Sequence, residues 1–315
     1  MTEDTTVLTA SPDQNVVTGR EKLLLVGAAG QLGRTLQQVL NHDRYDVLTL
    51  TRQDVDIADE AAIRATLDTL QPDLIINAAA YTAVDKAESE DIEARAANAT
   101  GPKFLARWAA ANDAWLLQIS TDFVFNGCHY RPYKPDDQTD PLGIYGRTKL
   151  EGELHVSYLA PKHSLVLRTS WVYSEFGHNF VKTMLKLMSV KDEIGVVADQ
   201  IGAPTSTWSL ARCISEILIV RPTGTLHWQD AGVASWYDFA VAIQDEASRL
   251  GLLEQTTAVQ AIRTKDYPTP AKRPPFSVLD CTETLAILAH NRKHWRHELQ
   301  DVLHAIKQQT ASGAG

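Results

Sequence analysis

The sequence predicts an α/β fold in which a doubly wound parallel sheet is followed by a smaller C-terminal α/β domain. Two observations predict it. Short apolar runs alternate with amphipathic segments up to about residue 170, which requires parallel strands joined by right-handed crossovers. The first apolar run leads directly into a glycine-rich turn, Gly27-Ala-Ala-Gly30-Gln-Leu-Gly33, as in Rossmann-like nucleotide-binding folds.

Composition excludes several classes of protein. The 315 residues are 44% hydrophobic and 22% charged, which is sufficient for a large core. The formal net charge is -9 and no dense basic cluster offsets it, so we expect no nucleic-acid partner. No apolar run approaches the ~18 residues of a membrane span, and residues 1–20 have no signal-peptide core. We therefore expect a cytoplasmic protein with no membrane partner.

The glycine turn lies between a predicted strand at 22–26 and a predicted helix at 34–40. Glycines at this spacing permit a tight turn and let the backbone approach a pyrophosphate, while the helix N-terminus favours the phosphate charge. A purely structural turn is the alternative for this segment alone.

The second predicted strand, 45–50, ends in Thr51-Arg52 instead of the acidic residue that binds a ribose 2′-hydroxyl. Arg52 can face a 2′-phosphate, which favours NADPH or dual use, but a solvated arginine is equally consistent. Asp56 is a candidate ligand for the adenine amino group. Alternatively, Asp56 or Asp59 begins the helix predicted over 60–70.

Further predicted strands at 72–76, 115–120 and 164–168 complete the alternation, with helices at about 90–112 and 145–158. Small residues after the third strand let the backbone lie against a flat ring or sugar. Ser120-Thr121-Asp122 follows the fourth strand at the edge where such sheets bind ligands, and a hydroxyl there can bond a carbonyl oxygen.

Tyr145 and Lys149 are four residues apart on a predicted helix and therefore share one face. An ammonium group near a phenol helps the phenol to act as a proton donor at neutral pH. This pair predicts the chemistry of carbonyl reduction.

The C-terminal part carries helical patterns at 179–188, 207–220 and 297–308, a helix N-capped by Ser235, and a short strand at 194–197. We expect these segments to cover the sheet and to form a lid over the substrate.

Eight ordered motifs give the chain a resemblance to a known family. The chain resembles the extended short-chain dehydrogenase/reductase superfamily and, within it, the dTDP-4-dehydrorhamnose reductases. The motifs are GAAGQLG, INAAAYTAVDKAESE, STDFVFNG, YGRTKLEGE, RTSWVY, DQIGAPTS, SWYDFA and YPTPAKRP, spread over about 22–282. The resemblance implies that NADPH or NADH reduces the C4 ketone of dTDP-4-dehydro-L-rhamnose, a step of dTDP-rhamnose biosynthesis.

The resemblance also implies roles for individual residues. Tyr145 donates the proton, Lys149 lowers the pKa of Tyr145 and holds the nicotinamide ribose, and Thr121 orients the ketone. The implied cofactor-binding residues are Gly30, Gln31, Leu32, Asp56, Ile57, Ala80, Tyr81, Thr82, Ile119, Tyr145 and Lys149, and the glycine turn and the end of the second strand add Gly27 and Arg52. The implied substrate-binding residues are Thr121, Asp122, Val84, Asp85, Trp171, Asn179, Gln200 and Arg273.

We expect three regions in the chain. Residues 1–20 form a flexible N-terminal extension. Residues 21–170 form the NAD(P)-binding Rossmann domain. Residues 171–315 form mainly the substrate-binding domain, with a possible strand and helix that return to the first domain.

The sequence departs from the family pattern at two places. Many relatives have a tyrosine where this chain has Phe123, so a hydroxyl contact near the substrate is expected to be missing. Some relatives pair subunits through a metal held by carboxylates, and the aligned positions here are Thr35 and Trp208. We therefore expect no metal and leave a homodimer open.

Two other functions remain open from the sequence. Relatives of this fold serve as non-catalytic regulatory subunits, as in the β subunit of methionine adenosyltransferase, where binding a partner is the function. A reductase, epimerase or dehydratase acting on another nucleotide sugar is the third possibility. Epimerases and dehydratases usually need further acid/base residues beside the threonine, and only Asp122 is present here.

Overall fold

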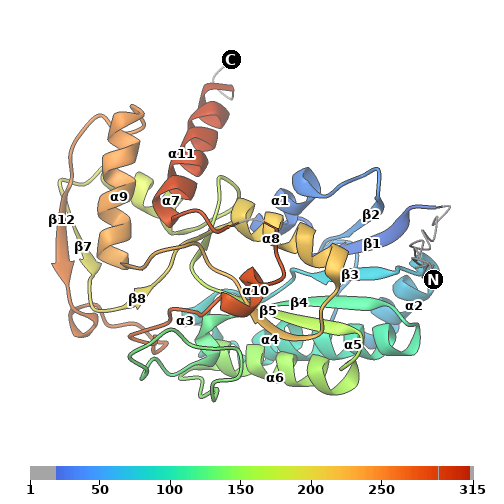
Figure 1. Ribbon diagram of the computed structural model, residues 1–315. Helices are drawn as coiled ribbons and strands as arrows, with labels where there is room; N and C mark the ends of the chain where they lie inside the picture. Colours follow the sequence, from blue (N-terminus) through green and yellow to red (C-terminus); the bar gives the residue numbers. More distant parts are fainter. Residues whose placement is uncertain (1–18, 290, 313–315) are drawn as a thin grey trace, which may run out of the picture.

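A six-stranded parallel sheet forms the centre of the protein (Figure 1). The computed structural model describes residues 19–289 and 291–312, so nearly all of the predicted extension lies outside the described residues. The strand order is β10-β5-β4-β3-β1-β2, and every neighbouring pair is parallel, which confirms the predicted sheet. The strands are β1 (Glu21–Val26), β2 (Tyr45–Leu50), β3 (Leu74–Asn77), β4 (Trp115–Thr121), β5 (Ser164–Thr169) and β10 (Gly224–His227).

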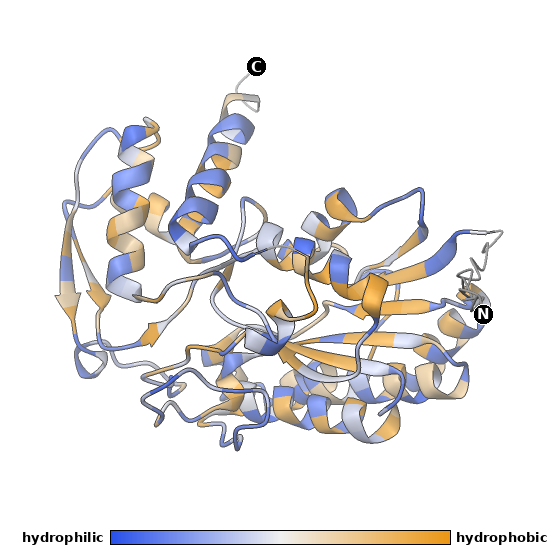
Figure 2. Ribbon diagram, in the orientation of Figure 1, coloured by the Kyte–Doolittle hydropathy of each residue, from blue (hydrophilic) through white to orange (hydrophobic). Residues whose placement is uncertain are grey.

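Helices cover both faces of this sheet, and therefore its central strands are mainly apolar. On one face lie α1 (Gln31–Val39) and α8 (Thr207–Val220), packed on Leu23, Leu25 and their neighbours. On the other face lie α2 (Glu60–Leu70), α5 (Gly101–Ala111) and α6 (Ile144–Leu159). Figure 2 shows the strands as mainly hydrophobic and the helices as mixed.

The chain order reverses at β1, because the crossover from β1 leads to β2 on one side and the next crossover returns to β3 on the other. Ligands of doubly wound sheets bind beside the carboxyl ends of the strands at such a switch point. The glycine turn follows β1 directly, and thus it lies at this point.

The helix predicted over 90–112 is interrupted in the structure. It consists of α4 (Asp91–Arg95), a π-helical turn η1 (Ala96–Thr100) and α5. Pro102, in the first turn of α5, lacks the N–H that a continuous helix needs. Single π-helical turns within α-helices occur frequently at functional sites, and this one carries the buried Asn98.

The C-terminal part has its own core beside the sheet. It contains α7 (Phe180–Met188), α9 (Trp236–Arg249) and α11 (Trp295–Ser312), which pack around Tyr173, Phe239 and Trp295. Ser235 caps α9 through a capping box with Asp238, as predicted. The short elements are α3 (Val84–Ala87), η2 (Asp122–Val124), β6 (Val172–Tyr173), β7 (Glu193–Val197), β8 (Ile201–Gly202), β9 (Thr205–Ser206), β11 (Ala234–Ser235), β12 (Ala258–Ile262), η3 (Thr264–Asp266) and α10 (Thr282–Leu285).

The chain crosses between the two parts more than once. After β5 it enters the C-terminal part, and then α8 packs against α1 and β10 extends the large sheet beside β5. In the described residues, no helix combines the length and the apolar character needed to cross a bilayer.

Asp230 is a fully buried carboxylate in the C-terminal part. Its Oδ2 accepts the Ser206 N–H at 2.9 Å, whereas Oδ1 accepts no hydrogen bond within the described chain. Burial raises its pKa from 3.8 to about 7. The folded protein therefore holds a proton that the unfolded chain releases between about pH 4 and pH 7, and the free energy of unfolding falls as pH rises through this range.

We predict that Asp230→Asn raises the free energy of unfolding by about 1–3 kcal/mol at pH 8, because it removes the buried charge. The increase should be nearly absent at pH 4. Denaturant unfolding at the two pH values measures it, with Asp46→Asn, at an exposed position of β2, as the control. Equal effects of Asp230→Asn at both pH values would contradict the assignment.

Candidate active site

The glycine turn after β1 packs so closely against neighbouring backbone that a side chain would not fit at Gly27 or Gly33. Gly27 has φ +82°, and a Cβ there would lie 2.6 Å from the Ala79 backbone nitrogen. A Cβ on Gly33 would lie 2.3 Å from the Gly27 carbonyl oxygen. Gly30 is the N-cap of α1 and no side chain caps the helix, so the first N–H groups of α1 can bind an anion.

A hollow of ≈ 530 Å³ opens between this turn and the ends of β2 and β3. Its position and composition match the place where doubly wound folds hold the adenosine half of a dinucleotide. Seven of the predicted cofactor-binding residues line it: Gly27, Gly30, Arg52, Asp56, Ile57, Ala80 and Tyr81.

The two aspartates after β2 have different roles, helix capping and lining of the hollow. Asp59 is the N-cap of α2 and accepts the Ala62 N–H at 3.0 Å. Asp56 instead accepts the Ala58 N–H at 3.0 Å and lines the hollow. Arg52 is exposed on the rim of the hollow, so its guanidinium group can reach a ligand there.

Tyr81 and Asn98 join the hollow to α6. The Tyr81 N–H donates to Asn98 Oδ1 at 2.9 Å, and Asn98 Nδ2 donates to Tyr81 O at 3.1 Å and to Thr148 Oγ1 at 3.2 Å. The Tyr81 hydroxyl donates to Glu90 Oε2 at 2.5 Å, and this bond raises the pKa of Tyr81 to about 12. The sequence pattern does not assign Asn98 to the site. The only indication is that Asn98 is a polar residue in an alanine-rich helix.

The three predicted catalytic residues lie on neighbouring elements. Thr121 ends β4, and Tyr145 and Lys149 occupy successive turns of α6, which packs on β4. Thr121 Oγ1 donates to Asp122 Oδ1 at 3.0 Å, and the Thr121 side chain also interacts with the phenol of Tyr145. Lys149 is only 3% exposed, and its Nζ donates to the Ile119 carbonyl oxygen at 2.7 Å.

Desolvation shifts the pKa values of both α6 residues. It raises the pKa of Tyr145 to about 12, with Thr121 opposing and the Asp122 charge adding to the rise. It lowers the pKa of Lys149 to about 8, with the Glu153 charge opposing. The resemblance implies a lowered pKa for Tyr145. The structure differs because burial desolvates the phenol and the Asp122 charge adds to the rise in its pKa.

Asp122 and Phe123 complete this edge. Asp122 is 2% exposed, and its Oδ2 accepts no hydrogen bond from the described residues. Burial raises the pKa of Asp122 to about 6, against the opposing effects of the Ser277 and Thr121 side chains. The Phe123 ring meets the Tyr145 ring edge to face, with centroids 5.5 Å apart.

Two predicted substrate residues bind each other. Arg273 Nη2 donates to Asp85 Oδ2 at 2.8 Å and Nη1 to Asp85 Oδ1 at 3.1 Å. This pairing lowers the pKa of Asp85. Val84 begins α3 beside Asp85. The guanidinium group of Arg273 is therefore already neutralised by a carboxylate of the opposite part of the chain.

Trp171 has a left-handed backbone, with φ +47°, which is strained for a bulky side chain. Its indole stacks on Trp236 with centroids 3.5 Å apart and an interplanar angle of 7°. A Cβ on Gly202 would lie 2.6 Å from the Trp171 ring, so glycine there leaves room for the stack.

Asn179 and Gln200 are tied to the protein itself. Asn179 caps α7, and its Nδ2 donates to Gln31 Oε1 at 2.9 Å. Gln31 in turn donates to the His178 carbonyl oxygen at 3.3 Å. Gln200 is 5% exposed and donates to Thr264 Oγ1 at 3.1 Å. Gln31 and Asn179, predicted to bind cofactor and substrate respectively, thus connect the two parts of the molecule.

The remaining predicted cofactor residues flank the same edge. Leu32 is buried in the first turn of α1, Thr82 follows Tyr81 before α3, and Ile119 lies within β4 and receives the Lys149 hydrogen bond.

The positions aligned with metal-bridging carboxylates have other partners. Thr35 Oγ1 is buried and lies 2.7 Å from Thr207 Oγ1. Trp208 Nε1 donates to Glu175 Oε1 at 3.0 Å. Over residues 19–289 and 291–312, no group of three or more His, Cys, Asp or Glu side chains is placed to hold a metal ion.

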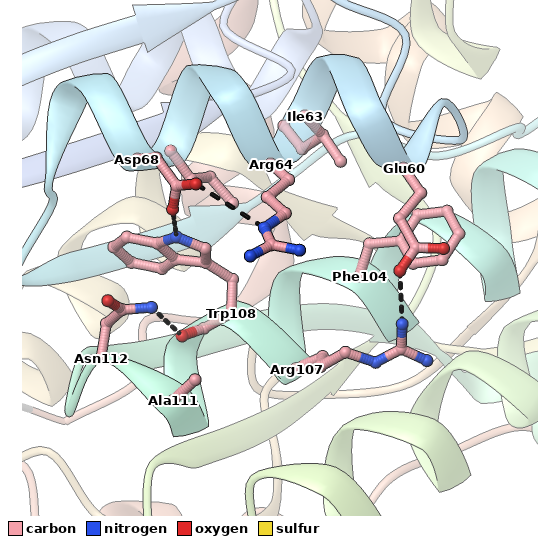
Figure 3. A pocket seen from close by; sticks show the side chains of 10 residues that line it. Glu60, Ile63, Arg64, Asp68, Phe104, Arg107, Trp108, Ala111 and Asn112 are labelled. Carbon is pink, nitrogen blue, oxygen red and sulfur yellow. Dashed lines mark hydrogen bonds and ion pairs between the residues drawn. The ribbon is translucent and has the colours of Figure 1, made fainter.

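A separate hollow of ≈ 420 Å³ lies between α2 and α5 (Figure 3). Two ion pairs cross or border it, Arg107 with Glu60 and Arg64 with Asp68. Trp108 Nε1 donates to Asp68 Oδ1 at 2.8 Å. None of the predicted site residues lines this hollow, so we assign its side chains to helix packing.

A family model described as the RmlD substrate binding domain matches residues 21–308. The chain belongs to this family. The match includes the glycine turn, the Thr121, Tyr145 and Lys149 constellation and the C-terminal part.

Curated and solved relatives agree with the RmlD family assignment. The dTDP-4-dehydrorhamnose reductase of Aggregatibacter actinomycetemcomitans is 44% identical over 288 residues, which cover 89% of this chain and 98% of that protein. A crystal structure of a dTDP-4-dehydrorhamnose reductase from Clostridium acetobutylicum has a TM-score of 0.85 and 39% identity, covering 91% of this chain and 99% of that one. The Bacillus anthracis reductase in complex with NADP has a TM-score of 0.86 and 33% identity, covering 91% and 100%.

We predict that Gly27→Ala abolishes NADPH binding and destabilises the fold by about 1–3 kcal/mol, because a Cβ at this backbone angle is strained. Fluorescence titration with NADPH and thermal unfolding measure the two effects. Gly19→Ala is the control, since a Cβ on Gly19 would meet nothing within 4 Å. Retention of NADPH affinity in Gly27→Ala would contradict the role of this turn.

Proposed function

We propose that this chain reduces the C4 ketone of dTDP-4-dehydro-L-rhamnose to dTDP-L-rhamnose with NADPH or NADH. The observation that carries the proposal is that Thr121, Tyr145 and Lys149 lie on the neighbouring elements β4 and α6 of a sheet whose first strand leads into a closely packed glycine turn. This arrangement occurs in a chain that is 44% identical to a named dTDP-4-dehydrorhamnose reductase over 98% of that protein's length.

The edge of the sheet fits NAD(P)H. The α1 N-terminus at Gly30, Gln31 and Leu32 offers backbone N–H groups to the pyrophosphate. Asp56 and Ile57 border the adenosine hollow, and Ala80 continues it towards α6. When bound, the cofactor supplies a hydride to the carbonyl carbon.

The protein supplies the proton that the ketone oxygen receives and the positive charge that stabilises the resulting phenolate. A pKa of about 12 keeps Tyr145 protonated at neutral pH, which is the form that a reduction requires. Thr121 Oγ1 can exchange its bond to Asp122 for one to the ketone oxygen and so hold that oxygen against the phenol. The Lys149 ammonium group stabilises the phenolate that remains after the proton is donated.

Substrate recognition falls mainly to the C-terminal part. We assign residues 21–170, together with α8 and β10, to cofactor binding and most of the remaining chain to the nucleotide sugar. Asp122 Oδ2 lacks a hydrogen bond in the described chain but is buried, so it can serve a sugar hydroxyl only if the site opens, and the Trp171 stack forms an aromatic wall. Arg273 can serve a diphosphate only if it exchanges Asp85 for that anion. Asn179 and Gln200 act by holding loops in place.

We predict that Tyr145→Phe lowers kcat about 10²- to 10⁴-fold, because it removes the general acid. The assay follows NADPH oxidation in the presence of dTDP-4-dehydro-L-rhamnose, and NADPH affinity should be retained. Tyr158→Phe on the same helix, where the side chain is 84% exposed, is the matched control. A wild-type protein that binds NADPH but leaves this sugar unreduced would refute the proposed function.

We predict that Arg52→Ala raises KM for NADPH roughly tenfold and leaves KM for NADH nearly unchanged, because only NADPH carries the 2′-phosphate. Steady-state kinetics with each cofactor measure the effect. Arg44→Ala, an exposed arginine just before the other end of β2, is the control. Equal changes for both cofactors would show that Arg52 does not face the 2′-phosphate.

A further inference from the structure

We propose that Glu153 is a positioning residue that keeps the Lys149 ammonium group charged and fixed at the Ile119 carbonyl, one helical turn after Tyr145. The inference rests on the proposed reductase function only for its kinetic consequence. Glu153 lies one helical turn after Lys149 on α6, and both side chains are 3% exposed.

Glu153 is held between two neighbouring strands. Its Oε1 accepts a hydrogen bond from the Ser120 hydroxyl on β4. On β5, Arg168 Nε donates to Oε1 at 3.0 Å, and Arg168 Nη2 donates to Oε2 at 2.7 Å. Ser120 and Arg168 are direct neighbours across β4 and β5. We call Ser120, Glu153 and Arg168 the Glu153 cluster.

The Glu153 cluster lies next to the Lys149 hydrogen bond. Ser120 follows Ile119, whose carbonyl oxygen accepts from Lys149 Nζ at 2.7 Å. By accepting hydrogen bonds from Ser120 and Arg168, the Glu153 carboxylate therefore fixes α6 on the sheet, close to the residue of β4 that bonds the Lys149 ammonium group. Tyr145, one turn earlier on the same helix, is placed by the same anchor.

Arg168 is itself fixed, so its pairing with Glu153 is rigid. Its Nη1 donates to the Pro135 carbonyl oxygen at 3.1 Å, and its guanidinium group lies 5.1 Å from the centroid of the Phe125 ring. Nη1 is also 3.4 Å from His227 Nε2. Burial and the Arg168 charge lower the pKa of His227 to about 3, so this imidazole is neutral and adds no further charge.

The charges complement the proposed reaction. Lys149 and Arg168 carry two positive charges, and Glu153 carries one negative charge. The cluster and Lys149 together thus retain one positive charge, on the same face of α6 as the phenol that would become a phenolate. Among the described residues, the Glu153 charge on α6 acts on Lys149, Arg168 on β5 pairs with Glu153, and β4 contributes the Ile119 carbonyl that accepts from Lys149 Nζ.

Desolvation and Glu153 act on Lys149 in opposite directions. Desolvation lowers the pKa of Lys149 to about 8, and the Glu153 charge limits that fall. Without this charge, Lys149 should lose its proton at a lower pH. Reduction should then fail on the alkaline side at correspondingly lower pH, since the neutral amine cannot stabilise the phenolate.

The test is a titration of Lys149 in the full chain by NMR of ¹³Cε-labelled lysine, with the signal assigned through Lys149→Arg. Glu153→Gln should lower the pKa of Lys149 by about one unit. The alkaline limit of kcat in the reductase assay should move by the same amount. Glu151→Gln is the matched control, because Glu151 lies on the same helix but pairs with Arg95. An unchanged Lys149 pKa in folded Glu153→Gln would overturn the proposal.

A second variant covers the case in which Glu153→Gln does not fold. Glu153→Asp keeps the charge and should leave the Lys149 pKa within about 0.3 units of wild type. A fall of one unit in Glu153→Asp would overturn the proposal. Because the NMR titration needs no substrate, an inactive wild-type protein would count against the proposed function alone.

Discussion

The hydrogen bond from Lys149 Nζ to the Ile119 carbonyl oxygen, 2.7 Å long, ties α6 to β4, and the geometry of the site depends on it. An ammonium group that is 3% exposed needs such partners, because burial without them is costly. Since Thr121 lies two residues further along β4 and Tyr145 one turn earlier on α6, this contact helps to bring the proposed proton donor to the hydroxyl that we propose orients the ketone.

Several of the predicted site residues have features that cost stability. Asp122 keeps an oxygen without a hydrogen bond in the described chain, Trp171 has a strained backbone, and Lys149 has a lowered pKa. Such departures from optimal stability concentrate where a protein must bind and react. The surrounding sheet, with both faces covered by helices, provides the apolar burial that sustains them.

The sequence predicted the features that depend on local pattern. The buried strands follow from continuous apolar runs, the turn at Gly27 from glycine spacing, and the common face of Tyr145 and Lys149 from helical periodicity. It could not predict pairings between distant residues, because nothing local specifies them. Asp85 with Arg273 and Gln31 with Asn179 are such cases.

Two further features depended on tertiary structure. The pKa of Tyr145 rises because the folded protein desolvates the phenol, an effect that a spacing of four residues does not contain. The helix predicted over 90–112 proved to include a π-helical turn, since periodicity over such a length does not resolve a single inserted residue. Glu153 lies in the YGRTKLEGE motif on α6, yet its partner Arg168 is on strand β5.

The most direct test of the account is the fate of a labelled hydride. The protein is incubated with dTDP-4-dehydro-L-rhamnose and NADPH deuterated at nicotinamide C4, using the two stereoisomers of the label separately. The account predicts that one of the two isomers delivers one deuterium to C4 of the sugar, where NMR detects it. Product that lacks deuterium at C4 with both isomers, or no reduced sugar at all, would contradict it.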